Sequence, residues 1–131
     1  AAVFVSMPRD ASWLMEAYLD AIGASGHVRE LVRRGFRKRY GVDISALSGL
    51  ERAHAIGCEV MVVHDEEDES VPAGHGRELH EPLGGRGVLR LTRGLGHNRL
   101  LRDAATVEAV AAFLAARLPP GAATGAARSP A

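Results

Sequence analysis

Two segments of the chain carry titratable side chains, and each segment follows an apolar run. The first segment, residues 64–72, reads HDEEDESVP, and the second, residues 94–98, reads GLGHN. In a parallel α/β sheet, the loops beyond the carboxyl ends of the strands gather at one edge. The two segments therefore predict that a carboxylate of the first and the imidazole of His97 in the second meet at that edge.

A carboxylate beside an imidazole is the acid-histidine pair of nucleophilic catalysis. The carboxylate accepts the N–H of one ring nitrogen, which keeps the other nitrogen free to take a proton and stabilises the imidazolium that forms. The two side chains must approach to about 3 Å for this hydrogen bond.

The two motifs resemble those of the α/β-hydrolase family. In that family the strand before the acid ends in a motif such as His-Gly-x-x-Asp-x-x-Val-Pro, and the last strand leads into Gly-x-Gly-His. Asp68 takes the acid position, four residues after His64 and four before Pro72, and His97 takes the histidine position. The resemblance covers about residues 1–118. Asp65 is a departure, because the family often has glycine there.

The resemblance implies a partial α/β-hydrolase fold in which residues 9–56 form a helical cap inserted after the first strand. It also implies ester-type hydrolysis through a nucleophile-His-Asp triad, with Asp68 and His97 as catalytic residues. In the full-length protein, such a triad would act on a small-molecule, ester-like substrate. No cofactor is expected, because this chemistry needs none.

The third member of a triad, the nucleophile, has no motif in this chain. The pattern Gly-x-Ser-x-Gly does not occur, and the nearest segment, GASGH at residues 23–27, has the wrong spacing and predicts that Ser25 caps a helix. Ser6 and Ser48 lack flanking glycines. We therefore expect the chain to be the C-terminal portion of a hydrolase, inactive alone, with the nucleophile upstream of Ala1.

The hydrophobic pattern predicts an α/β fold with about three parallel strands and flanking helices. Residues 1–118 are expected to form this portion of the domain, and residues 119–131 a disordered tail. Ser12 is the expected cap of the first helix. The expected strands are 2–5, 58–64 and 87–92, and the expected helices are 12–22, 27–40, 43–56, 72–83 and 103–118. One face of the second helix carries apolar residues 28, 31, 32, 36 and 40, and the last helix is expected to bury residues 107, 110, 111, 114 and 118.

Composition excludes several classes of function. The chain has 131 residues, with 16 basic residues balancing 16 acidic ones, so no overall charge attracts nucleic acid. The basic run 37–39 is interpreted as a solvated helix face. No apolar run is long enough to span a membrane, and no signal peptide is evident, so a cytoplasmic protein without a membrane partner is expected. The single Cys58 is expected to be buried and inert.

Two alternatives remain beside the hydrolase. The chain could be a non-catalytic interaction module on the same scaffold. It could also hold a metal through His64, Asp65, Asp68 and His97, although no established metal-ligand spacing is present. His75 and His80 are expected at the surface. For the hydrolase portion, the unpaired edge of the first strand predicts self-association, and a stable monomer would favour the interaction module.

Overall fold

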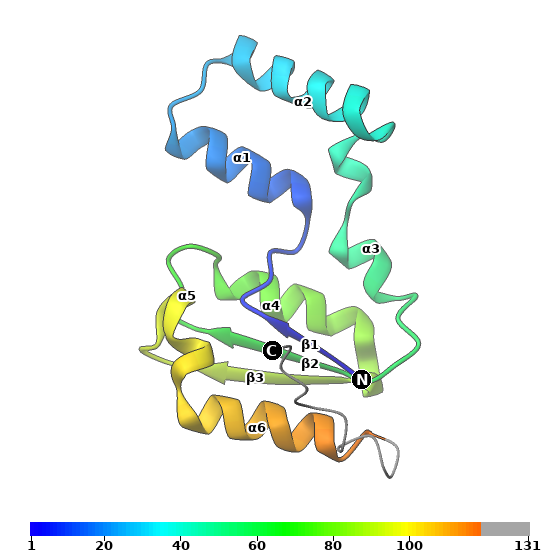
Figure 1. Ribbon diagram of the computed structural model, residues 1–131, viewed down its shortest axis with the longest axis vertical. Helices are drawn as coiled ribbons and strands as arrows, with labels where there is room; N and C mark the ends of the chain where they lie inside the picture. Colours follow the sequence, from blue (N-terminus) through cyan, green and yellow to red (C-terminus); the bar gives the residue numbers. More distant parts are fainter. Residues whose placement is uncertain (119–131) are drawn as a thin grey trace, which may run out of the picture.

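A three-stranded parallel sheet forms the centre of the molecule (Figure 1), as seen in a computed structural model that describes residues 1–118. The strands are β1 (Ala2–Val5), β2 (Val60–Asp65) and β3 (Gly87–Thr92), in the order β1-β2-β3. Helices flank the sheet, so the expected α/β fold is confirmed. The tail that was predicted to be disordered, residues 119–131, lies outside the described residues.

Strand β2 is buried along its whole length because helices cover both faces of the sheet. On one face, Val60 and Val62 pack with Ala53 and Leu83. On the other face, Met61 and Val63 pack with two residues from the C-terminal helical segment, Leu100 and Phe113. Burying β-branched residues on both faces is typical of a central parallel strand. This burial fixes the position of the strand end that carries the acid loop.

The helices around the sheet are shorter than the sequence pattern predicts. After β2 come α4 (Ala73–His80) and the 3₁₀ helix η2 (Glu81–Arg86), and after β3 come α5 (Gly96–Arg99), η3 (Leu100–Arg102) and α6 (Ala104–Ala115). Asp103 caps α6 as expected, but the expected apolar face of this helix is wrong in part. Val107 and Leu118 are exposed, because Thr106 and Phe113 supply the buried contacts.

The segment between β1 and β2 forms a helical cap on one side of the sheet (Figure 1). It contains α1 (Ala11–Ala21), α2 (Gly26–Tyr40), η1 (Ile44–Ala46) and α3 (Gly49–Ala53). Asp10, not the expected Ser12, caps α1 by accepting the N–H of Trp13 at 2.6 Å. Ser25 caps α2, as predicted.

The single helix predicted over residues 43–56 is wrong, because two caps divide it. Asp43 caps η1 and Ser48 caps α3. Between them the backbone turns toward β1, where the N–H of Gly49 donates to the carbonyl of Arg9 at 2.9 Å. A Cβ atom at Gly49 would lie 2.7 Å from that carbonyl oxygen, so the close approach requires glycine.

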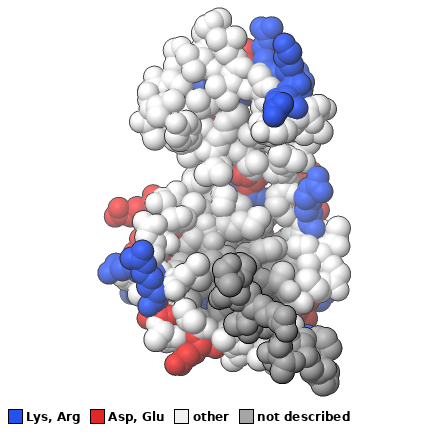
Figure 2. Space-filling model, in the orientation of Figure 1, with Lys and Arg blue, Asp and Glu red and all other residues white. Residues whose placement is uncertain are grey.

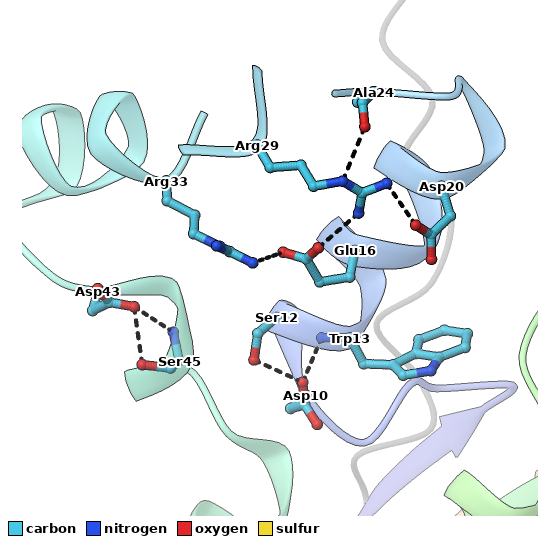
Figure 3. A network of polar contacts seen from close by, with 10 residues as sticks. All are labelled: Asp10, Ser12, Trp13, Glu16, Asp20, Ala24, Arg29, Arg33, Asp43 and Ser45. Carbon is cyan, nitrogen blue, oxygen red and sulfur yellow. Dashed lines mark hydrogen bonds and ion pairs between the residues drawn. The ribbon is translucent and has the colours of Figure 1, made fainter. Parts of the chain in front are cut away.

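Ion pairs join α2 to α1 (Figure 3). Arg29 binds Glu16 at 2.9 Å and Asp20 at 2.6 Å, and Arg33 binds Glu16 at 2.7 Å. Arg29 also donates to the carbonyl of Ala24 at 3.0 Å. The apolar residues that share one face of α2 are not buried, because the arginine face is turned toward α1.

The cap is joined to the sheet layer through α4. The ring of Trp13 packs edge-on against His75, with the ring centroids 4.3 Å apart, and Arg9 binds Glu78 at 2.8 Å. His75 is thus buried, and the prediction of a surface position was wrong. Burial, and then the charge of Arg9, lower the pKa of His75, so the imidazole is a neutral packing group.

Two further features concern the chain as a whole. Cys58, expected to be buried, is only half-buried because it lies before the first residue of β2. Within residues 1–118, no helix is both long enough and apolar enough to cross a bilayer.

The outer edge of β1 predicts self-association. Ala2 and Ser6 donate their N–H groups to β2, at 3.0 Å each, so the alternation of a strand turns the N–H of Val3 toward the free edge. We expect reversible dimers in sedimentation velocity at micromolar concentration. Val3→Pro removes this outward N–H without removing a bond to β2, and should give a monomer. Val3→Ala is the control, and a monomeric parent chain would contradict the prediction.

Candidate active site

The acid loop leaves β2 and folds around the carboxylate of Asp68. This carboxylate is buried, and its Oδ1 accepts the backbone N–H groups of Ser70 at 2.9 Å and Val71 at 2.8 Å. These bonds form because the backbone turns back over its own aspartate side chain. They leave Oδ2 directed toward the neighbouring strand end.

His97 enters from the other loop, at the start of α5. Gly94 and Gly96 adopt φ values of 81° and 62°, which glycine reaches without steric cost. This turn brings Nδ1 of His97 to 2.9 Å from Oδ2 of Asp68. The predicted contact between the two side chains is confirmed, and because the acceptor is a carboxylate, Nδ1 carries the proton.

A second buried carboxylate, Asp65, holds the two loops together. Its Oδ2 accepts the hydroxyl of Thr92 at 2.7 Å and the N–H of Leu95 at 3.1 Å, and its Oδ1 accepts the N–H of Glu67 at 3.0 Å. From the sequence, Asp65 was expected only as a departure from glycine and as a ligand of the alternative metal site. The sequence did indicate this role: Asp65 ends an almost wholly apolar strand, and a charged residue that is buried needs hydrogen-bond partners.

The electrostatics of Asp65 follow from these partners. Burial alone raises the pKa of a carboxyl group and is the largest single influence here. The hydroxyl of Thr92 and several backbone N–H groups outweigh it and lower the pKa to about 2. Asp65 is therefore ionised at neutral pH, and its negative charge stabilises the two loop backbones that donate to it.

His64 supports the acid loop from inside the protein. Its Nε2–H donates to the carbonyl of Val71 at 2.8 Å, and the same nitrogen lies 3.5 Å from Oδ2 of Asp68. The ring is fully buried against α4, where a Cβ atom at Gly76 would lie 2.8 Å from Nδ1. The family-like His64 thus has a positioning role, and Gly76 provides the space that it needs.

Ser6 completes the surroundings of Asp68. It directly follows β1, its hydroxyl is buried without a hydrogen-bond partner of normal geometry, and its φ of 46° is unusual for a residue other than glycine. Burial is the largest influence on the pKa of Asp68 and raises it. The N–H of Val71, His97, the hydroxyl of Ser6 and the N–H of Ser70 outweigh burial, so the pKa lies below its usual value.

An open pocket of about 420 Å³ lies beside His97, between the acid loop and the histidine loop. Its lining includes Glu67, Glu69 and Ser70 from the first loop and residues 94–99 from the second. The side chain of His97 is 35% exposed, whereas that of Asp68 is inaccessible. One member of the pair is thus buried and fixed, and the other faces a space into which a reacting group can enter.

The four residues of the alternative metal site do not form a ligand cluster. In the described part of the chain, no group of three or more His, Cys, Asp or Glu side chains is arranged to hold a metal ion. The Nε2–H of His64 donates to the carbonyl of Val71, and Oδ2 of Asp65 accepts hydrogen bonds from Thr92 and Leu95. Nε2 of His64 and both oxygens of Asp65 are therefore engaged in internal hydrogen bonds, and Nδ1 of His64 faces Gly76 of α4.

No family model matches this sequence, and no curated protein is detectably similar to it. The class that the fold and the site define is therefore an α/β protein with a buried Asp68 and a partly exposed His97 in contact at the carboxyl edge of a parallel sheet.

In the variant Asp68→Asn, the proton of the neutral His97 ring is expected to move from Nδ1 to Nε2. Ser70 and Val71 both donate to Oδ1, so the asparagine carbonyl should stay there and its NH₂ group should face Nδ1 of His97. The neutral ring then has to carry its proton on Nε2. Two-bond ¹H–¹⁵N correlations of the neutral imidazole would measure this. Glu69→Gln is the control, and an unchanged tautomer in Asp68→Asn would contradict the prediction.

The substitution Asp65→Asn is expected to destabilise the protein by about 3 kcal/mol at neutral pH, because an amide cannot accept hydrogen bonds on both terminal atoms. The folded-state pKa of Asp65 is lowered, so its contribution is present above about pH 4 and is lost as the pH falls toward 2. Urea unfolding should therefore show the difference between parent and variant shrinking over this range. Glu69→Gln should leave the free energy of unfolding nearly unchanged, and a difference independent of pH would refute this role.

Proposed function

We propose that this chain is the C-terminal portion of an α/β-hydrolase and supplies the acid, Asp68, and the histidine, His97, of a nucleophile-His-Asp triad. The observation that carries the proposal is the 2.9 Å contact between Nδ1 of His97 and Oδ2 of Asp68. The loops that make it follow adjacent parallel strands, as the resemblance to that family implies.

The chemistry assigned to the pair is general base and general acid catalysis. Nε2 of His97 takes the proton of a nucleophile as that group attacks the carbonyl of a small, ester-like substrate, and later returns the proton to the leaving group. The carboxylate of Asp68 stabilises the imidazolium between these steps without taking its proton. Two backbone N–H groups hold the carboxylate in place, so little reorganisation is needed during the reaction.

The nucleophile of this proposal comes from a segment outside the 131 residues. Within residues 1–118, no hydroxyl or thiol is hydrogen-bonded to His97. Ser25 caps α2, Ser48 caps α3, and the buried hydroxyl of Ser6 lies on the side of Asp68. The free edge of β1 is the surface against which the missing part of the sheet would pack. The cytoplasm is the proposed compartment, where the thiol of Cys58 would stay reduced.

The second candidate is an interaction module that keeps the scaffold without catalysis. The observation that favours it is that no hydroxyl or thiol is hydrogen-bonded to His97 in the described chain. In this case the pair would be a structural hydrogen bond and the β1 edge would be the functional surface. The genomic sequence upstream distinguishes the two, because an in-frame Gly-x-Ser-x-Gly between a strand and a helix supports the enzyme and a start codon at this boundary supports the module.

Activity measurements test the proposal directly. The isolated chain should not react with a fluorophosphonate probe and should hydrolyse p-nitrophenyl acetate only at the rate of free imidazole. The longer protein that contains the upstream segment should do both. In that protein, His97→Ala should reduce kcat by at least about 10³-fold, and Asp68→Asn by a similar factor. Glu69→Gln should be active, and turnover by the isolated chain that Ser6→Ala abolishes would overturn the assignment of the nucleophile.

A further inference from the structure

Helix α2 lies farthest from the sheet, at the outer limit of the cap (Figure 1). None of its 15 residues is buried. Its apolar side chains are exposed to an unusual degree, at 40% for Val28, 49% for Leu31 and 38% for Val32. A surface helix normally turns such residues toward the protein core.

The ion pairs of α2 determine which face is turned outward. Arg29, Arg33 and Arg37 follow one another at intervals of four residues, and they bind acidic residues of the cap, Arg37 through Asp43 at 2.6 Å. Residues three or four positions apart share a helix face, and the helix repeat places Val28, Leu31 and Gly35 on the opposite side. The apolar stripe therefore points away from α1.

The outer face of α2 also carries charges that are not neutralised. Of the basic residues of α2, Arg34, Lys38 and Arg39 form no ion pair in the described chain, whereas Arg29, Arg33 and Arg37 each do. Figure 2 shows basic side chains gathered at this end of the molecule. Three positive charges thus lie beside the apolar stripe.

A shallow depression of about 450 Å³ lies within this face. It is lined by Leu31, Arg34, Gly35, Arg37 and Lys38, so cations and an apolar side chain border the same space. Apart from its chain neighbours and the adjoining backbone of α2, no heavy atom lies within 4 Å of the point that a Cβ atom at Gly35 would occupy, so no side chain covers this part of the depression.

We propose that the outer face of α2 binds an anionic lipid surface, with Leu31, Val28 and Val32 entering the headgroup boundary and Arg34 and Lys38 contacting phosphate groups. A helix with an apolar stripe and flanking cations lies in the plane of such an interface. The stems of Arg and Lys can cover apolar surface while their charged ends reach phosphate. The depression has the charge and the space to accept a headgroup phosphate.

This combination favours a lipid surface over a nucleic acid. A nucleic-acid site would use the cations together with stacking aromatic side chains, but the aromatic residues of α2, Phe36 and Tyr40, pack against each other on the arginine side of the helix and not beside Arg34 and Lys38. Such a site would also gain nothing from exposed Val28 and Leu31. The inference concerns where the protein acts and does not depend on the proposed catalytic pair, since α2 contributes no residue to the Asp68–His97 contact.

Co-sedimentation of the full chain with vesicles tests the inference. Vesicles of phosphatidylcholine mixed with phosphatidylglycerol should bind the protein, vesicles of phosphatidylcholine alone should not, and added salt should weaken the binding. The double variant Arg34→Gln, Lys38→Gln should bind about 30-fold more weakly, because each cation near an anionic surface contributes roughly one kcal/mol. Leu31→Gln should also weaken binding, although it changes no charge.

The matched control is the double variant Arg52→Gln, Arg102→Gln, which removes two exposed cations from other helices and should bind like the parent chain. Circular dichroism would confirm that all variants are folded. The inference would be overturned if the chain did not bind the anionic vesicles. It would also be overturned if the control variant lost as much binding as the double variant Arg34→Gln, Lys38→Gln. Binding to duplex DNA as tight as binding to vesicles, with no effect of Leu31→Gln on either, would show a purely electrostatic surface and would also overturn it.

Discussion

The buried carboxylate of Asp65 is the interaction on which the geometry of the candidate site depends. It lies at the last position of β2, opposite Thr92 at the end of β3, and it accepts hydrogen bonds from both loops that leave these strands. A buried charge is costly without partners, so the loops are held where they can donate to it. The contact between Asp68 and His97 follows, because each side chain lies within a few residues of an atom bound to Asp65.

The cap is held together by a different kind of force. Around the sheet, apolar residues fill both faces of β2, whereas α2 is joined to α1 by arginine pairs with partly exposed carboxylates. Exposed ion pairs contribute about 1 kcal/mol or less each and weaken with salt. The contact between α1 and α2 is therefore expected to be sensitive to salt, while the acid-histidine pair is held by the apolar layer around β2.

The local environments of the carboxylates explain why only one of them suits catalysis. Asp65 and Asp68 are both buried and both have lowered pKa values, but the oxygens of Asp65 are occupied by the backbone and by Thr92. Asp68 keeps one oxygen for an imidazole that reaches the surface. Asp65 and Asp68 therefore have different roles because their hydrogen-bond donors differ: Asp65 holds the two loops together, and Asp68 orients His97. The exposed Glu67 and Glu69 have neither set of donors.

The sequence alone predicted the three strands and their parallel arrangement from apolar β-branched runs alternating with helical patterns. It also predicted the approach of Asp68 to His97, because loops that follow adjacent parallel strands meet at one edge of the sheet and the motif spacing singles out these two residues. It did not determine which face of α2 is buried, where His75 lies or what Asp65 does. Those depend on partners distant in the sequence, such as Glu16 for Arg29, Trp13 for His75 and Thr92 for Asp65. Periodicity shows that a helix has two different faces, but only the packing of the folded chain decides which one meets a neighbour, because an arginine face with acidic partners can replace an apolar one.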